Sequence, residues 1–223
     1  MPIDHRFIAR LCREAYGSPP DIADTDLVAC ATVTPSLDGH IYVAFRGTDP
    51  DNVHDDLADL EFIPRMVHGF GRVHRGFWDA GRGITSQVAA RVTGQTYHLT
   101  GHSLGGAIAL VVAVRLAEAG MPPATLTTFG APRVGMVEAA GAMKRLLARQ
   151  TIITMYRHAG DPVPHLPPQV AMVEDWQHPV PLTQLGDADE AIDWLDIRKT
   201  LADRLGDHAI AAYETAVTLA TLG

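Results

Sequence analysis

A serine lies at the centre of a glycine-flanked pentapeptide. Residues 101–105 read Gly-His-Ser-Leu-Gly, between a β-branched and aromatic segment at 96–100 and an Ala- and Leu-rich stretch at 106–120. Gly-x-Ser-x-Gly at a strand-to-helix turn is typical of a nucleophile elbow, which exposes the serine hydroxyl above a sheet. The flanking glycines leave room for backbone that passes close by. A glycine-rich turn with an incidental serine is the alternative, but the two flanking segments favour an elbow at Ser103.

A serine hydroxyl is a weak nucleophile until a base accepts its proton, so the elbow requires an acid and a histidine further along the chain. The chain order expected with this elbow is Ser, then Asp or Glu, then His. Asp161 is the first acid after the β-branched segment 151–156, and Pro162 stiffens the turn that would present it. A turn-capping Asp before proline is the alternative reading. Its place after a strand favours Asp161 as the acid.

Four histidines follow the serine: His158, His165, His178 and His208. The first precedes the acid, the second lies only four residues after it, and the third is in an expected edge segment. His208 comes at the start of the expected last helix, where the preceding loop can bring it over the serine. The required chain order therefore favours His208 as the base over a surface histidine at a helix start.

Two backbone positions are candidates to bind an oxyanion. The first is the N–H of the residue after the nucleophile, Leu104, and the second lies in the loop after an early strand. That loop follows the apolar segment 41–45 and contains Thr48, which offers both an N–H and a hydroxyl. The sequence thus predicts an oxyanion hole made by Thr48 and Leu104.

The composition limits the classes of protein. The chain has 223 residues and a formal net charge of −8, which argues against nucleic acid as a partner and against capture by anionic membranes. No apolar run has transmembrane length. The N-terminal residues lack an apolar signal-peptide core, so we expect a protein that is cytoplasmic or exported by a leaderless route. Cys12 and Cys30 could pair, but apolar neighbours favour two buried thiols.

Apolar strand-like segments alternate with helical ones, which predicts a mainly parallel sheet with helices on both faces. Helices are expected at 5–16, 76–93, 106–120, 136–149 and 207–222, and strands at 27–34, 41–45, 96–100, 126–129 and 151–156. The proline-rich region 162–189 is expected to be an irregular surface excursion. We expect one domain over residues 1–223.

Six segments together resemble the class 3 lipase family, the fungal-lipase-like branch of the α/β hydrolases. The matching segments are 45–48, 73–77, 100–107, 129–135, 160–168 and 207–208. The resemblance implies an α/β-hydrolase fold with Ser103, Asp161 and His208 as the triad, and Thr48 and Leu104 as oxyanion donors. It gives His74 and Arg133 structural roles.

The segment 49–62 corresponds to the lid of the fungal enzymes but differs in character. Asp56 stands where those enzymes often have tryptophan, and five aspartates precede Leu60. Charged groups resist leaving water, so such a lid would bind a lipid surface poorly.

The predicted function is a serine hydrolase that cleaves carboxylic esters of acylglycerols or simple acyl esters through an acyl-enzyme. The substrate is thus an ester or lipid, contact with a lipid interface is at most transient, and neither metal nor organic cofactor is implied. A phospholipase, for example an exported effector, and a non-catalytic acyl-ligand-binding protein are the alternatives.

Overall fold

The computed structural model describes residues 3–24, 29–48, 61–168, 175–186 and 203–221. The helices are α1 (His5–Gly17), α3 (Arg75–Val92), α4 (Leu104–Glu118), α5 (Val137–Leu147), α7 (Leu205–His208) and α8 (Ile210–Ala220), with the 3₁₀ turn η1 (Val163–His165). The strands are β1 (Ile22–Ala23), β2 (Cys30–Pro35), β3 (Ile41–Phe45), β4 (Pro64–Val67), β5 (Gly71–His74), β6 (Tyr97–His102), β7 (Thr125–Phe129), β8 (Gly135–Met136), β9 (Ile152–His158), β10 (Trp176–Gln177) and β11 (Thr183–Leu185).

The larger sheet has seven strands in the order β1-β2-β3-β6-β7-β9-β11. Strands β3, β6, β7, β9 and β11 run parallel to one another, while β1 and β2 add an antiparallel edge beside β3. The predicted mainly parallel sheet is therefore confirmed. Because the central strands are parallel, the residues that follow β3, β6, β7 and β9 all lie at one edge of the sheet, where ligand sites of such folds form.

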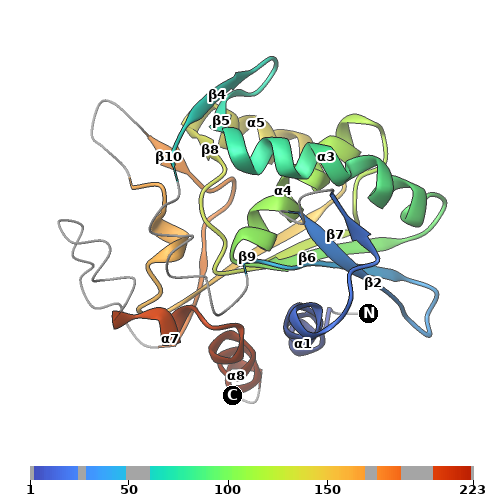
Figure 1. The fold of residues 1–223 in the computed structure, drawn as a ribbon, viewed down its shortest axis with the longest axis vertical. Helices are drawn as coiled ribbons and strands as arrows, with labels where there is room; N and C mark the ends of the chain where they lie inside the picture. Colours follow the sequence, from blue (N-terminus) through green and yellow to red (C-terminus); the bar gives the residue numbers. More distant parts are fainter. Residues whose placement is uncertain (1–2, 25–28, 49–60, 169–174, 187–202, 222–223) are drawn as a thin grey trace.

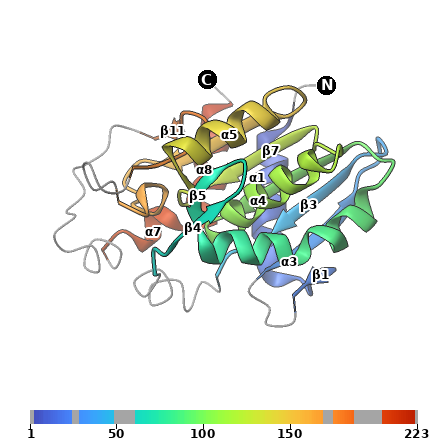
Figure 2. The same cartoon turned by 90° about the horizontal axis from the view of Figure 1, so that it is seen from above.

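Helices cover both faces of this sheet (Figures 1 and 2). Helices α3, α4 and α5 lie on one face, and α1 and α8 pack side by side on the other. Helix α1 begins where the Asp4 side chain accepts hydrogen bonds from the N–H groups of Arg6 and Phe7, a typical N-cap. Helix α4 is buried on nearly every side because it lies between the sheet and its two helical neighbours.

Three features differ from the sequence-based expectations. A second, antiparallel sheet in the order β10-β8-β5-β4 has no counterpart among them. The region 162–189, expected to be irregular, contributes β11 to the large sheet and β10 to the small one. The expected last helix is divided, because Ala209 has extended backbone angles (φ −61°, ψ 137°) between α7 and α8. The strands of the small sheet and β11 are only two to four residues long, too short for a clear periodic signal, which explains why the first two features escaped prediction.

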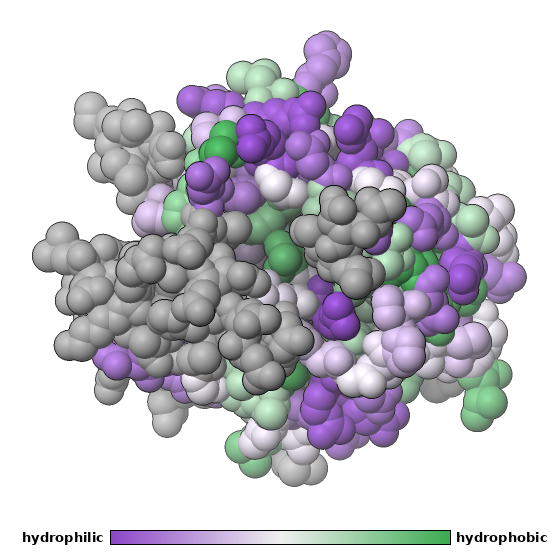
Figure 3. Space-filling model, in the orientation of Figure 1, coloured by the Kyte–Doolittle hydropathy of each residue, from purple (hydrophilic) through white to green (hydrophobic). Residues whose placement is uncertain are grey.

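The described surface shows no gathering of large apolar side chains. The exposed ones are Leu37, Met66, Val137, Ile152 and Leu219, and each belongs to a different element or turn. Figure 3 shows hydrophilic side chains over much of the described part of one face, with apolar ones scattered between them. No helix among the described residues has the length and apolar character needed to cross a membrane. Cys12 and Cys30 are both free and buried. Residues 49–60 of the expected lid lie outside the described residues.

Candidate active site

Ser103 occupies a strained turn between β6 and α4. Its backbone angles are φ 56° and ψ −131°, and among the described residues it is the one non-glycine with positive φ. Such strain persists only where the surroundings enforce it. A Cβ atom on Gly101 would lie 2.4 Å from the carbonyl carbon of Gly105, and one on Gly105 would lie 2.2 Å from the carbonyl oxygen of Phe45. Both glycines are therefore required by close backbone approach, as the elbow predicts.

The structure brings the three predicted side chains together in one hydrogen-bonded row. His208 Nε2 lies 2.8 Å from Ser103 Oγ, and His208 Nδ1 lies 2.9 Å from Asp161 Oδ2. All three residues are buried. An ionised carboxylate only accepts hydrogen bonds, so Nδ1 carries the proton and Nε2 is free to accept the proton of the serine hydroxyl. This is the geometry that activates a serine nucleophile.

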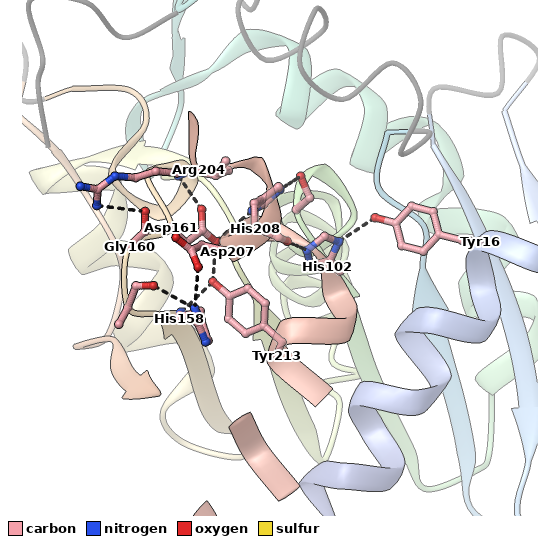
Figure 4. Close-up of polar contacts among 12 residues, drawn as sticks. Tyr16, His102, His158, Gly160, Asp161, Arg204, Asp207, His208 and Tyr213 are labelled. Atoms are coloured by element: carbon pink, nitrogen blue, oxygen red, sulfur yellow. Dashed lines mark hydrogen bonds and ion pairs between the residues drawn. The ribbon is translucent and has the colours of Figure 1, made fainter. Parts of the chain in front are cut away.

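The carboxylate of Asp161 is held at both oxygens. Oδ1 accepts from the N–H of Val163 at 2.8 Å, and Oδ2 accepts from the Tyr213 hydroxyl at 2.5 Å in addition to His208. The Tyr213 hydroxyl accepts in turn from the N–H of His158 at 2.9 Å. Burial and the neighbouring Asp161 raise the pKa of Tyr213 well above its usual value, so it remains a donor. Figure 4 shows Asp161, His208 and Tyr213 converging from the loop after β9, the end of α7, and α8.

Tyr213 was not anticipated from the sequence. It lies on α8 with a fully buried side chain, where a tyrosine is expected simply to pack its ring. Tyr213 and Asp161 are 52 residues apart in the sequence, so no local sequence motif predicts their hydrogen bond.

The loop that carries Asp161 is fastened by two side chains from outside it. Arg133 Nη1 donates to the carbonyl oxygens of His165 and Pro167 at 2.7 and 2.8 Å. His178 Nε2 donates to the carbonyl oxygen of Pro164 at 2.7 Å. Arg133, expected to have a structural role behind the elbow, thus makes these side-chain hydrogen bonds to the loop that carries Asp161. Besides His178, the other two histidines rejected as bases also lie around this loop: the His158 N–H donates to the Tyr213 hydroxyl, and His165 Nε2 lies 3.0 Å from Arg157 Nη1.

The partly buried His178 makes stability depend on pH. Burial lowers the pKa of His178 to about 4, whereas an unfolded histidine titrates near ~6.5. Between these values the unfolded chain binds more protons than the folded one, so the free energy of unfolding falls as the pH falls. His178→Gln keeps an N–H donor for Pro164 but cannot be protonated. We expect the loss of stability between pH 7 and pH 5, measured by urea unfolding, to be about 1–2 kcal/mol smaller in this variant.

The matched control is His68→Gln, which replaces an exposed histidine in the turn between β4 and β5. Its stability should depend on pH as that of the unchanged protein does. If His178→Gln and the unchanged protein lose the same stability between pH 7 and pH 5, the pKa of His178 is not depressed by folding.

The two candidate oxyanion donors belong to the elbow itself and to the loop after β3, which approaches the elbow closely. Leu104 is the first residue of α4, where a backbone N–H has no acceptor within the helix. Thr48 follows the end of β3 and is partly buried. The preceding Gly47 approaches the elbow so closely that a Cβ atom on it would lie 3.1 Å from Ser103 Cβ.

His74 has the structural role expected for it. It caps α3, because Nδ1 accepts from the N–H of Phe77 at 3.3 Å, and its ring stacks on Phe77 with centroids 3.8 Å apart. Burial lowers the pKa of His74 to about 4, so it is neutral at pH 7. Within the described residues, no group of three His, Cys, Asp or Glu side chains is arranged to hold a metal ion.

A mainly parallel sheet, a serine elbow after β6 and the order Ser, Asp, His define an α/β hydrolase. The profile of the family described as Lipase (class 3) matches residues 42–171, so the chain belongs to the class 3 lipase family. The family resemblance and the fold expected from it are thereby confirmed.

Two relatives illustrate the similarity. The secreted mono- and diacylglycerol lipase 1 of Fusarium solani is 31% identical over 176 residues, which cover 69% of this chain and 51% of the relative. The secreted mono- and diacylglycerol lipase A of Penicillium cyclopium is 30% identical over 137 residues, covering 57% and 43%. The matched region thus spans about half the length of these relatives.

A solved structure extends the similarity of the fold. A triacylglycerol lipase, described as having a catalytic centre formed by a triad of the serine-protease kind, superposes with a TM-score of 0.66 at 23% identity. The superposition covers 91% of this chain and 90% of that one.

The expected location of the protein needs correction. The N-terminal residues led to the expectation of a protein that is cytoplasmic or exported by a leaderless route. That expectation is contradicted, because the Fusarium and Penicillium relatives are both named as secreted lipases.

Proposed function

We propose that this protein is a serine hydrolase that cleaves carboxylic esters of acylglycerols or simple acyl esters. The observation that carries the proposal is the buried row of hydrogen bonds from Ser103 through His208 to Asp161. A protein that only binds acyl ligands has no need for an activated serine. Membership of the class 3 lipase family supports the same chemistry.

In the proposed reaction, Ser103 Oγ attacks the ester carbonyl carbon while His208 Nε2 accepts the hydroxyl proton. Asp161 keeps the imidazole in the required tautomer and stabilises the imidazolium that forms. The tetrahedral intermediate collapses when its C–O bond to the alcohol breaks, and His208 gives its proton to the departing alcohol. Water, deprotonated by His208, then attacks the acyl carbon; the bond from that carbon to Ser103 Oγ breaks, His208 returns the proton to Oγ, and the carboxylic acid leaves.

The carbonyl oxygen becomes negatively charged in the tetrahedral intermediate. We assign its stabilisation to the N–H of Leu104, next to the serine, and to Thr48 in the loop that approaches the elbow at Gly47. Donors fixed in advance are effective because they need no reorganisation during the reaction.

The proposed substrate class rests on the relatives and on the segment 49–62. The Fusarium and Penicillium relatives are named for mono- and diacylglycerols, and the superposed structure for triacylglycerol. The five aspartates of the expected lid favour short or soluble acyl esters, and only transient contact with a lipid interface.

A fluorophosphonate probe tests the proposal, because it reacts covalently only with an activated serine. We expect labelling of one serine per molecule, located at Ser103 by peptide mass spectrometry. The same preparation should hydrolyse p-nitrophenyl butyrate, with no step in rate as the ester passes its solubility limit.

Heat-denatured protein is the matched control and should not be labelled. Absence of labelling in the folded protein would overturn the proposed function. Labelling combined with a steep rise in rate on emulsified ester would retain the hydrolase but contradict the preference for soluble esters.

A further inference from the structure

We propose that Tyr16 and His102 are positioning residues, which join the proposed oxyanion loop to the proposed base and so align the reacting groups. This inference rests on the proposed function and extends it to two residues outside the triad. It concerns three segments that are distant in the sequence: residues 45–48, the elbow 101–105, and residues 206–209.

One chain of hydrogen bonds runs from helix α1 to the base (Figure 4). The Tyr16 hydroxyl lies 2.7 Å from His102 Nδ1, and His102 Nε2 lies 2.6 Å from the backbone carbonyl oxygen of His208. A carbonyl oxygen only accepts, so His102 Nε2 must carry the proton. Nδ1 is then the acceptor and the Tyr16 hydroxyl is the donor. Both ring nitrogens of His102 are thus bonded, and its neutral tautomer is fixed.

The same tyrosine contacts the proposed oxyanion loop. Burial raises the pKa of Tyr16, and the neighbouring Gly47 backbone lowers it in part, so the hydroxyl keeps its proton as a donor. A Cβ atom on Gly47 would lie 2.5 Å from that hydroxyl and 2.7 Å from the carbonyl oxygen of His102. The residue immediately before Thr48 therefore rests directly on Tyr16 and on the elbow.

The environment of His102 suits a group that must remain neutral. Its side chain is buried, and its ring centroid lies 4.7 Å from that of His208. Burial, and then the proximity of His208, hold the pKa of His102 well below its usual value. A charged His102 would repel the imidazolium that His208 becomes during the reaction. A neutral His102 can donate to the His208 backbone without opposing that charge.

The arrangement positions His208 through its backbone. His208 ends α7, and Ala209 then turns to extended geometry before α8 begins. The hydrogen bond from His102 holds the carbonyl group at that turn, and Asp161 holds the far side of the imidazole. Small displacements of a catalytic group lower the reaction rate steeply. The two hydrogen bonds that hold His208 are therefore expected to affect the reaction rate as well as the stability of the fold.

Tyr16→Phe removes the hydroxyl and retains the ring. We expect kcat per labelled active site to fall about tenfold, as expected for one hydrogen bond, with KM changed by less than about twofold. The rate constant for fluorophosphonate labelling should fall in parallel. A purely structural role would reduce the number of labelled sites without changing kcat per labelled site.

Tyr97→Phe is the matched control. The Tyr97 hydroxyl donates to the backbone carbonyl of Met121, and Tyr97 begins the same strand, β6, that leads to the elbow at its other end. This variant loses a tyrosine hydrogen bond far from the serine, so kcat per labelled site should be unchanged.

Substitutions of His102 give an independent test. Glutamine can place an N–H near the position of Nε2 and retain the bond to the His208 carbonyl, whereas alanine loses both contacts. We expect kcat per labelled site to fall about tenfold in His102→Gln and about 100-fold in His102→Ala.

The inference is overturned if Tyr16→Phe matches the unchanged protein in both kcat per labelled site and labelling rate, or if the glutamine variant is no better than alanine. The proposed function fails in a different way, namely if the unchanged protein is neither labelled nor active.

Discussion

Ser103→Ala should lower kcat for ester hydrolysis by about 10⁶-fold, because no other group at the elbow can form the acyl-enzyme. His208→Ala should cost a similar factor, since an unactivated hydroxyl is a poor nucleophile. Residues that act as one unit are not additive, so the double variant should be no worse than either single variant. Steady-state rates on p-nitrophenyl butyrate measure all three effects.

Ser86→Ala is the control for this series, because Ser86 is an exposed serine on α3. It should retain full activity. Retention of more than about 1% of kcat in folded Ser103→Ala would contradict the proposed nucleophile, because direct attack by water cannot sustain such a rate. Circular dichroism establishes that each variant is folded before rates are compared.

Gly105→Ala should lower the free energy of unfolding by at least about 3 kcal/mol, an overpacking effect at the upper end of its usual range. The new Cβ atom would lie 2.2 Å from the carbonyl oxygen of Phe45 and 2.7 Å from the carbonyl carbon of Arg46. These are backbone atoms and cannot rotate away as a side chain would. Relief requires β3 and the following residues to move, which would also displace Thr48 and reduce activity.

Gly83→Ala provides a control with the opposite sign. Gly83 lies inside α3, and nothing lies within 4 Å of the position its Cβ atom would take. Alanine is favoured over glycine in a helix interior, so this variant should gain about 0.5–1 kcal/mol. Urea unfolding of both variants measures the difference. Equal stabilities would contradict the close backbone approach at the elbow.

The proposed triad could be read from the sequence because each member stands at the boundary of an element. Ser103 follows an apolar strand, Asp161 follows a β-branched one, and His208 precedes the last helix. The chain order of the three then removed His158, while His165 stood too close to the acid and His178 in an expected edge segment. The boundaries of strands and helices are local properties of the sequence, and the order of three residues along the chain can be read from it directly.

The supporting residues could not be predicted in the same way. Tyr16 reaches His102 across 86 residues, and Tyr213 reaches Asp161 across 52. Both tyrosines lie on helices that pack against the sheet, where an aromatic residue is explained by burial alone. They differ from ordinary core tyrosines in the hydrogen-bond partner of each hydroxyl, which is His102 for Tyr16 and Asp161 for Tyr213. These partners depend on how helices α1 and α8 pack against the sheet.

The helix break at Ala209 could not be predicted from the helix propensity of the residues around it. Alanine is the best helix former, so the sequence predicts one helix through 207–222. In the structure the carbonyl of His208 accepts from His102, and Ala209 adopts extended geometry. A tertiary contact therefore overrides a local preference at the residue next to the proposed base.

The large sequence separations between the proposed active-site groups also bear on when the site forms. The contacts of Ser103 and His102 with residue 208 span 105 and 106 residues, so they close long loops and are expected late in folding. During synthesis, a chain that has reached Asp161 already contains the nucleophile but still lacks His208. By the proposed mechanism, the nascent protein therefore stays inert until α7 and α8 have been synthesised and α8 has packed beside α1 on its face of the sheet.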